Sequence, residues 1–328
     1  MADCICCTPK FLKPELLLES ARVARETNPL NHPQELTRAS GFEPAMAPTP
    51  ERIAVLTSKW WKSGGKNFSV KFLDTSESAL KSRILSHMNA WSAVCNVSFR
   101  ESTDSGAHVR IARAEDGYWS YVGTDILLIP RGEPTMNLQG FTADTSEAEY
   151  RRVVRHETGH TIGCPHEHMR KQIVKKIDRA KAIEFYRQTQ GWTEAQTIRQ
   201  VLTPLSDSSI LGTPDTDRTS IMCYHIPGEI TKDGNAIPGG PDIDDIDAAF
   251  MGKVYPRPGT PAPGPAGPVS PPVSPLPPPL PPDVAGGNGG GNAPLATEVE
   301  QLRVEVARLR EERDTLKKAM RILFSEQA

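Results

Sequence analysis

The sequence predicts an α+β fold for one domain, residues 51–257, followed by a linker and a coiled coil. Strand and helix patterns alternate through that domain. The composition changes at its end, where residues 258–294 are rich in Pro and Gly. A heptad pattern of apolar residues then occupies residues 295–326. Residues 1–50 form a separate, mostly polar N-terminal segment.

Local patterns predict the elements of the domain. Period-two alternation predicts a strand at residues 67–73, and apolar residues at helical spacing predict a helix over residues 76–94. A Thr/Ser cap followed by acidic residues predicts a helix over residues 145–163. Three more strands are predicted from the segments NVSFRE (96–101), HVRIARA (108–114) and TDILLIP (124–130).

The N-terminal segment contains a predicted helix and a group of thiols. The helix covers residues 14–28, and the Pro-containing break APTPE follows before the domain begins. Three of the six cysteines, Cys4, Cys6 and Cys7, form the motif CICC. This motif suits a metal-binding tip or a lipidated tip, and the sequence leaves its role open. The scattered cysteines favour free thiols over a disulfide framework.

Charge and hydropathy exclude several classes of partner. A net charge of -2 argues against nucleic acid or an anionic membrane as the main partner. No stretch approaches the ~20 apolar residues of a transmembrane helix. The first twenty residues lack a basic region followed by an apolar core, so no signal peptide is visible. We expect a cytoplasmic protein or one exported by a non-classical route.

The region after the domain predicts a spacer and a self-association helix. Residues 258–282 favour polyproline II, although SPLPPPLPP also suits an SH3-like groove. In the heptads, β-branched residues at a and leucines at d favour a parallel two-stranded coil, interrupted at a by Arg313. Glutamates at g face arginine and lysine at e of a partner chain. The sequence predicts a homodimer, with a lone helix packed on the domain as the alternative.

The stretch HETGHTIGCPHEHMR (156–170) contains the residues that predict a reactive site. His156 and His160 lie one turn apart on one helix face, so both rings reach one ion. Glu157 is rotated away by roughly 100°, where a carboxylate faces a bound water and does not bind the ion. Gly163 ends the helix and reverses the chain, which lets His166 return to the same ion.

These residues predict a hydrolytic zinc site. Three neutral histidines leave a fourth position for water, whose pKa falls to about 7 on zinc. We therefore expect one Zn2+ ion per chain. A structural zinc would have four Cys/His ligands, and Cys164 is the open alternative as a ligand; the turn at Gly163 favours a small buried residue there instead. His168 is interpreted as a polar neighbour.

Several motifs together resemble the metzincin superfamily of zinc metallopeptidases, and within it the astacin family, over residues 59–257. Glu167, directly after the third histidine, resembles the glutamate that is characteristic of the astacin family at this position. DRTSIMCYHIP resembles the family's Met-turn, with Met222 beneath the metal and Tyr224 beside it. The segments GYWSYVG (117–123) and DIDDIDAAFMGKVYP (242–256) resemble two further family segments.

The resemblance implies both fold and function. It implies a metzincin-like two-subdomain fold, with a twisted, mostly parallel sheet and two long helices in an upper subdomain that ends near residue 163. It also implies a zinc metalloendopeptidase acting on a polypeptide substrate. Glu157 would be the general base and Tyr224 would stabilise the oxyanion. We expect the substrate to pair with the predicted strand TDILLIP.

The chain departs from the family pattern in its cysteines. Tyr118 stands where the family has a cysteine, and Cys95 lacks a closing partner. Residues 1–50 are placed where a prosegment would lie, and in relatives Glu167 contacts the N-terminus made by its removal. A thiolate of CICC capping the zinc is a further alternative. For function, the alternatives are a catalytically inactive zincin-fold module tethered by the coiled coil, or a peptide trimmer.

Overall fold

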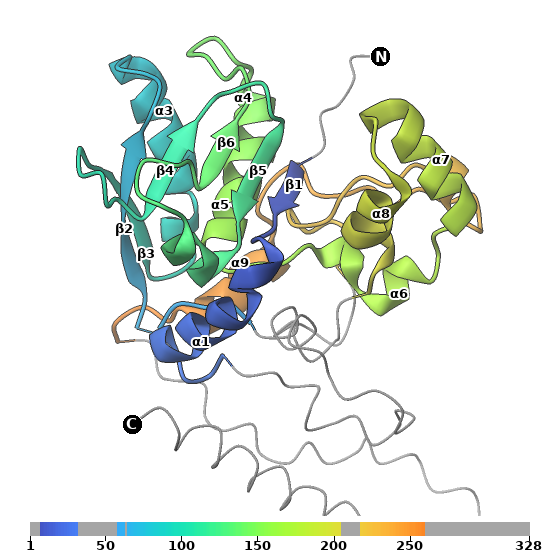
Figure 1. Ribbon diagram of the computed structural model, residues 1–328, viewed down its shortest axis with the longest axis horizontal. Helices are drawn as coiled ribbons and strands as arrows, with labels where there is room; N and C mark the ends of the chain where they lie inside the picture. The colour runs from blue at the N-terminus through green and yellow to red at the C-terminus, as the bar shows by residue number, and fades with distance from the viewer. Residues whose placement is uncertain (1–6, 32–57, 63, 205–216, 260–328) are drawn as a thin grey trace, which may run out of the picture. The chain divides into compact units, whose positions relative to one another are not determined.

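The computed structural model describes residues 7–31, 58–62, 64–204 and 217–259 (Figure 1). The chain divides into two compact units, residues 1–267 and 268–328. Apart from residues 258 and 259, the predicted linker and the coiled coil lie outside the described residues, and so do Cys4 and Cys6. Those predictions therefore stay predictions.

A six-stranded sheet forms the upper part of the domain, in the order β1-β5-β6-β4-β2-β3. All neighbouring strands run parallel except β5 and β6, which are antiparallel. The mixed strand and helix content and the mostly parallel sheet agree with the α+β prediction. The strands are β1 (Cys7–Lys10), β2 (Lys66–Phe72), β3 (Val97–Glu101), β4 (Val109–Ala112), β5 (Tyr118–Tyr121) and β6 (Met136–Leu138).

The prediction of a strand at TDILLIP is wrong. This segment is the 3-10 helix η4 (Gly123–Leu128). Gly123 has φ 51, and a Cβ there would overlap the carbonyl oxygen of Lys59, to which Thr124 N donates at 3.1 Å. That close approach turns the chain away from the sheet. On this side the sheet ends with β1 as its edge strand, and β5 lies next to it, as Figure 1 shows.

The predicted helix at residues 76–94 is present but shorter, as α3 (Ser78–Met88) followed by the short 3-10 turn η3 (Trp91–Ala93). Asn89 explains the early end. Its amide donates to Leu85 O and Phe99 O at 2.9 Å each and accepts from Phe99 N, so the chain is tied to β3. The predicted apolar face is fully buried at Leu80, Ile84, Met88 and Trp91.

The predicted helix over residues 145–163 is continuous. It consists of α4 (Glu147–Glu149), a π-helical turn η5 (Tyr150–Val154) and α5 (Arg155–Thr161). Ser146 caps its start by accepting from Glu149 N at 3.2 Å. Gly163 ends it at φ 107, where a Cβ would overlap the Trp60 ring. The predicted helix end at this glycine is confirmed.

Helices and short helical turns make up the lower part of the domain. The closing segment forms α9, whose N-terminus has a capping box between Asp244 and Asp247. After α9, Tyr255 donates to Ile162 O at 2.6 Å and accepts from Trp61 N at 3.0 Å, which ties it to the end of α5. The lower elements are η6 (Glu167–Met169), α6 (Lys171–Val174), α7 (Arg179–Gln190), α8 (Glu194–Thr197), η7 (Ile198–Leu202), η8 (Gly228–Ile230) and α9 (Asp245–Val254).

The N-terminal segment packs on this domain. The helix predicted at residues 14–28 is confirmed as η1 (Pro14–Leu16) and α1 (Leu17–Thr27). Strand β1 before it was not predicted. Among the helices of the described ranges, none has the length and apolar character needed to cross a bilayer.

Candidate active site

Three histidines from two segments converge beside the sheet. His156 and His160 come from α5, and His166 comes from the loop after Gly163. The Nε2 atom of His166 lies 3.1 Å from Nε2 of His156 and 2.9 Å from Nε2 of His160. The sequence predicted this convergence from the helical spacing and the glycine turn.

The hydrogen bonds of the histidines fix which ring nitrogens face the centre. Nδ1 of His156 donates to Ile221 O at 2.6 Å, and Nδ1 of His160 donates to Cys164 O at 2.8 Å. Burial lowers the pKa of all three rings, so neutral imidazoles are favoured, and in His156 and His160 the lone pair is on Nε2. A tetrahedral zinc with Zn–N of ~2.0–2.1 Å separates its nitrogens by ~3.3 Å. These donors fit zinc.

Glu157 lies beside the histidines in a fully buried position. Its carboxylate, a ring nitrogen of His156 and the Cys7 sulfur all lie within 4.8 Å of one another. Burial raises the pKa of Glu157 well above its ordinary value, an effect that a nearby dication would offset. A strongly shifted pKa is typical of a carboxyl group that takes part in proton transfer.

Met222 packs against the helix that carries the first two histidines. A Cβ at Gly159 would overlap the Met222 sulfur, so only glycine allows this contact. The backbone of the turn is held in place, because Met222 O accepts from Glu167 N at 2.9 Å. Asp247 of α9 adds a second support by accepting from Ile221 N at 2.9 Å. The structure places Met222 against α5 at Gly159, next to His160, which is consistent with the position that the resemblance implies.

Tyr224 stacks on the histidine cluster. Its ring centroid lies 4.3 Å from that of His166 and 4.0 Å from that of His168. His168 is fully buried; its Nε2 donates to Gln200 O at 2.9 Å, and its Nδ1 accepts from Tyr224 N at 3.4 Å. The sequence analysis interpreted His168 only as a polar neighbour of the site. In the structure, His168 contacts both the ring and the backbone N–H of Tyr224 and so holds that residue in place.

The side chains of Cys164 and Glu167 contact residues that surround the site. Cys164 is buried, its sulfur contacts Met251 at 3.4 Å, and it reaches the histidines only through its carbonyl. Glu167 pairs with Arg170 and accepts from Asp217 N at 3.2 Å. Burial raises the pKa of Glu167 to about 7, opposed by the charge of Arg170. A small cavity of about 40 Å³ adjoins Glu167.

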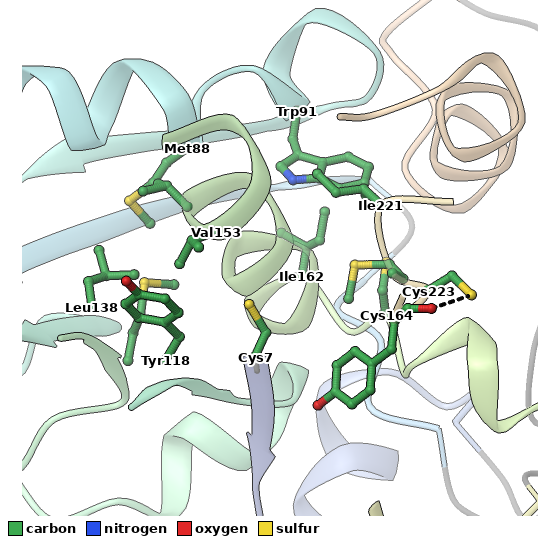
Figure 2. Packing of buried hydrophobic residues seen from close by; sticks show 14 of the residues in the cluster. Cys7, Met88, Trp91, Tyr118, Leu138, Val153, Ile162, Cys164, Ile221 and Cys223 are labelled. Carbon is green, nitrogen blue, oxygen red and sulfur yellow. Dashed lines mark hydrogen bonds between the residues drawn. The ribbon is translucent and has the colours of Figure 1, made fainter. Parts of the chain in front are cut away.

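The residue whose position the sequence left open is Cys7. Its side chain lies at the start of β1, is buried, and points toward the helix between Val153 and Ile162 (Figure 2). The motif CICC was the only sequence signal, and it did not distinguish Cys7 from Cys4 or Cys6. In the structure Cys7 is identified by its place as the first residue of β1, which pairs with β5.

Comparisons with known proteins agree with this geometry. The zinc metalloproteinase nas-27 of Caenorhabditis elegans is 33% identical over 90 residues, which cover 27% of this chain and 19% of that protein. The alignment therefore spans about a fifth of this relative. A solved structure of myroilysin is 27% identical and has a TM-score of 0.57, covering 61% of this chain and 96% of that chain.

The profile of the peptidase family described as Astacin matches residues 54–227, which include the three histidines, Glu157, Met222 and Tyr224. This match covers more than half of the chain. The chain belongs to the astacin family.

Proposed function

We propose that the chain is a zinc-dependent endopeptidase. The observation that carries this proposal is the convergence of three Nε2 atoms with Glu157 beside them. His156, His160 and His166 would hold the metal. Zinc bound there would polarise the scissile carbonyl and lower the pKa of a bound water to about 7.

The side chains of the chain then move protons and stabilise charge. Glu157 takes a proton from the attacking water and passes it to the leaving amine. The Tyr224 phenol donates to the oxygen of the scissile carbonyl as negative charge develops on it. His168 positions that phenol by stacking on its ring at 4.0 Å and accepting from its backbone N–H.

The substrate path follows the edge of β5. The antiparallel partner of β5 is β6, and β1 occupies its other edge in this structure. An extended polypeptide pairs with such an edge through backbone hydrogen bonds. The edge of β5 replaces the TDILLIP segment as the expected substrate-binding strand. That segment is helical and has no row of backbone groups with which a substrate could pair.

The first experiment measures cleavage of a denatured protein mixture by the purified full chain loaded with one zinc. The variant Glu157→Gln is the matched control, because it keeps the shape of the side chain and removes the base. Cys7→Ser is assayed beside them, because the Cys7 sulfur lies against Glu157. We expect cleavage by the full chain or by Cys7→Ser, and none by Glu157→Gln in either background.

Two outcomes would contradict the proposal. Equal cleavage by Glu157→Gln would show that the activity comes from a contaminant or from another site. No cleavage by any form, with zinc content confirmed, would favour a catalytically inactive binding module or a trimmer of short peptides. The trimmer would be distinguished by cleavage of dipeptide and tripeptide mixtures.

We also propose that residues 295–326 join two chains as a parallel coiled coil. The heptads with leucine at d and the complementary g and e charges support this proposal. Light scattering of the full chain should give the mass of a dimer. Replacing Leu302 and Leu309 by serine should give a monomer, whereas replacing the exposed-position pair Glu300 and Arg308 by alanine should not. A monomeric full chain would refute the coil.

A further inference from the structure

We propose that Asp217, Asp244 and Asp247 bind a hard divalent cation, Ca2+ by its chemistry, and that this ion ties the Met-turn to the start of α9. Asp217 is the first residue of the Met-turn segment DRTSIMCYHIP, and the other two residues form the cap of α9. The cluster shares no residue with the three histidines. The inference goes beyond the proposed function and does not depend on peptide cleavage.

The first support is the convergence of three carboxylates. One oxygen of each residue lies within 4.8 Å of the other two. Ca2+ binds oxygen at ~2.3–2.6 Å, so two ligands on opposite sides of the ion are about 5 Å apart. One ion therefore reaches all three oxygens. A set of carboxylates without nitrogen or sulfur favours a hard cation over zinc.

The second support is a buried oxygen of Asp217. Only 7% of this residue is exposed. Its Oδ1 accepts from the backbone N–H and from the hydroxyl of Thr219, both at 2.9 Å. Its Oδ2 is buried and has no hydrogen-bond partner among the described residues. A buried carboxylate oxygen without a partner is unfavourable, and a cation bound in the cluster would satisfy it.

The third support is the lack of a neutralising side chain. Arg170 pairs with Glu167, and in the part of the chain that the structure describes no lysine or arginine forms an ion pair with the three aspartates. Burial raises the pKa of Asp247 to about 6. Burial also raises the pKa of Asp244, and the charge of Asp217 adds to this effect. The cluster therefore concentrates negative charge that a dication would compensate.

Further oxygens lie beside the carboxylates. The Ser220 hydroxyl donates to Asp247 Oδ1 at 2.7 Å, and the Thr219 hydroxyl lies 3.3 Å from Asp244 Oδ2. Either hydroxyl can turn to offer a lone pair to an ion. An adjoining cavity of about 40 Å³ is lined in part by Asp217, Ser220 and Asp247, which is space enough for water. Ca2+ takes about 6–8 oxygen ligands, and water commonly completes the set.

An ion in this cluster would support the histidine site through the backbone. Asp247 Oδ2 accepts from Ile221 N at 2.9 Å, and Ile221 O accepts from Nδ1 of His156 at 2.6 Å. Asp217 lies at the other end of the same short segment. Joining Asp217 to α9 would therefore hold the backbone that carries Met222, without any contact between the ion and the histidines.

The experiment uses the full chain with one zinc bound, after passage through metal-free buffer, and Tb3+ as the probe. Tb3+ replaces Ca2+ at oxygen sites and emits when a nearby tryptophan is excited; Trp91 lines the same cavity as Asp217 and Asp247. We expect emission that excess Ca2+ removes, in the full chain and in Asp245→Asn, and its loss in Asp217→Asn. Asp245 is exposed on the first turn of α9, outside the cluster, so its variant matches the change of charge.

Calcium itself should stabilise the fold. At about 100 times its dissociation constant, Ca2+ should raise the Tm of the full chain and of Asp245→Asn by roughly 5–10 °C, with no rise in Asp217→Asn. Asp244→Asn is a second variant, because asparagine still caps the helix while one ligand charge is lost. It should need about tenfold more Ca2+ for the same rise. Circular dichroism checks that each variant is folded.

Three outcomes would count against the inference. Emission and a Tm rise that are equal in Asp217→Asn and the full chain would place the ion elsewhere. A folded full chain with neither signal would show that the cluster binds no ion. Emission that depends on Asp217, with no change in Tm, would keep the site and overturn the tie between the Met-turn and α9. If Asp217→Asn does not fold, Asp244→Asn decides between the same outcomes. Failure of the proposed function appears separately, in the cleavage assay.

Discussion

Helix α5 and strand β1 supply neighbouring groups to the same site, yet they relate to the chemistry in opposite ways. The helix carries His156, His160 and Glu157, which the proposed reaction requires. The strand carries Cys7, within 4.8 Å of two of those groups, and its pairing with β5 occupies the edge a substrate would use. The comparison teaches that closeness to a metal site does not by itself mean a part in catalysis. Substitutions should therefore abolish activity on α5 and raise it on β1.

The largest expected effect is on the helix side. In the Cys7→Ser background, Glu157→Gln should lower kcat by roughly 10²–10⁴-fold, because a general base contributes about this much. Zinc content should not change, since the three histidines remain. The matched control is Glu115→Gln, at an exposed position in the loop before β5, which should keep full activity. A similar loss in both variants would remove Glu157 from the mechanism.

A smaller loss is expected from the tyrosine that faces the histidines. Tyr224→Phe keeps the ring that stacks on His168 and removes the phenol. Steady-state kinetics should give a kcat lower by about 10²-fold with KM nearly unchanged, as for the loss of one oxyanion donor. An increase in KM without loss of kcat would instead give Tyr224 a role in substrate binding.

The strand side should respond in the opposite direction. Asn31→Ala leaves the backbone N–H and C=O of Trp60 without their side-chain partner, at a cost of about 1–3 kcal/mol for each buried group. Amides of α1 should exchange faster with solvent and peptide cleavage should increase. Asn89→Ala is the matched control, because it also removes buried backbone contacts, but between α3 and β3. Increased cleavage in that control would mean that general loosening is the cause.

The support of the Met-turn predicts a pH signature. Burial raises the pKa of Asp247 to about 6, despite its hydrogen bonds from Ser220 and Ile221 N. The folded chain therefore binds more protons than the unfolded chain between pH ~4 and ~6, and stability falls as pH rises through this window. The metal-free chain should lose up to ~3 kcal/mol of urea stability relative to Asp247→Asn from pH 4 to pH 7. A constant difference would mean that the pKa is not raised.

The smallest effect is expected at the exposed surface of α1. Arg22 forms ion pairs with Glu19 and Glu26, and more than half of its side chain is exposed. Such pairs contribute little to stability in water. Arg22→Ala should therefore leave amide exchange in α1 and peptide cleavage unchanged. A marked rise in activity would show that α1 is held by charge and not by the buried asparagines.

The sequence predicted the elements whose signals are local. Helix α5 has a cap at Ser146, ligands at helical spacing and a terminating Gly163, all within one stretch of chain. Strands β1, β5 and β6 have three or four residues each, which gives periodicity little to identify, and among the strands this short only β4 was predicted. Their pairing joins residues far apart in sequence, such as Cys7 and Tyr118.

The wrong strand at TDILLIP has a related cause. Ile126 is buried and Leu127 is exposed, which is the alternation expected of a strand. The decisive contact is between Gly123 and the carbonyl of Lys59, which no local pattern contains. In the same way, the histidine ligands could be predicted from spacing, whereas the positions of Cys7 and His168 depend on tertiary packing.

The anchors at Asn28 and Asn31 lie on one side of residues 32–57, and the backbone of Trp60 and Trp61 that they bind lies on the other. While the chain is intact, the segment and the cleft are one molecule, and the segment rebinds at an effective concentration that does not change on dilution. A single cut between Asn31 and Ser58 makes rebinding bimolecular. The segment would then be lost by dilution even if every contact described above remained as strong. Occupation of the β5 edge by β1 would then depend more on the covalent connection than on affinity.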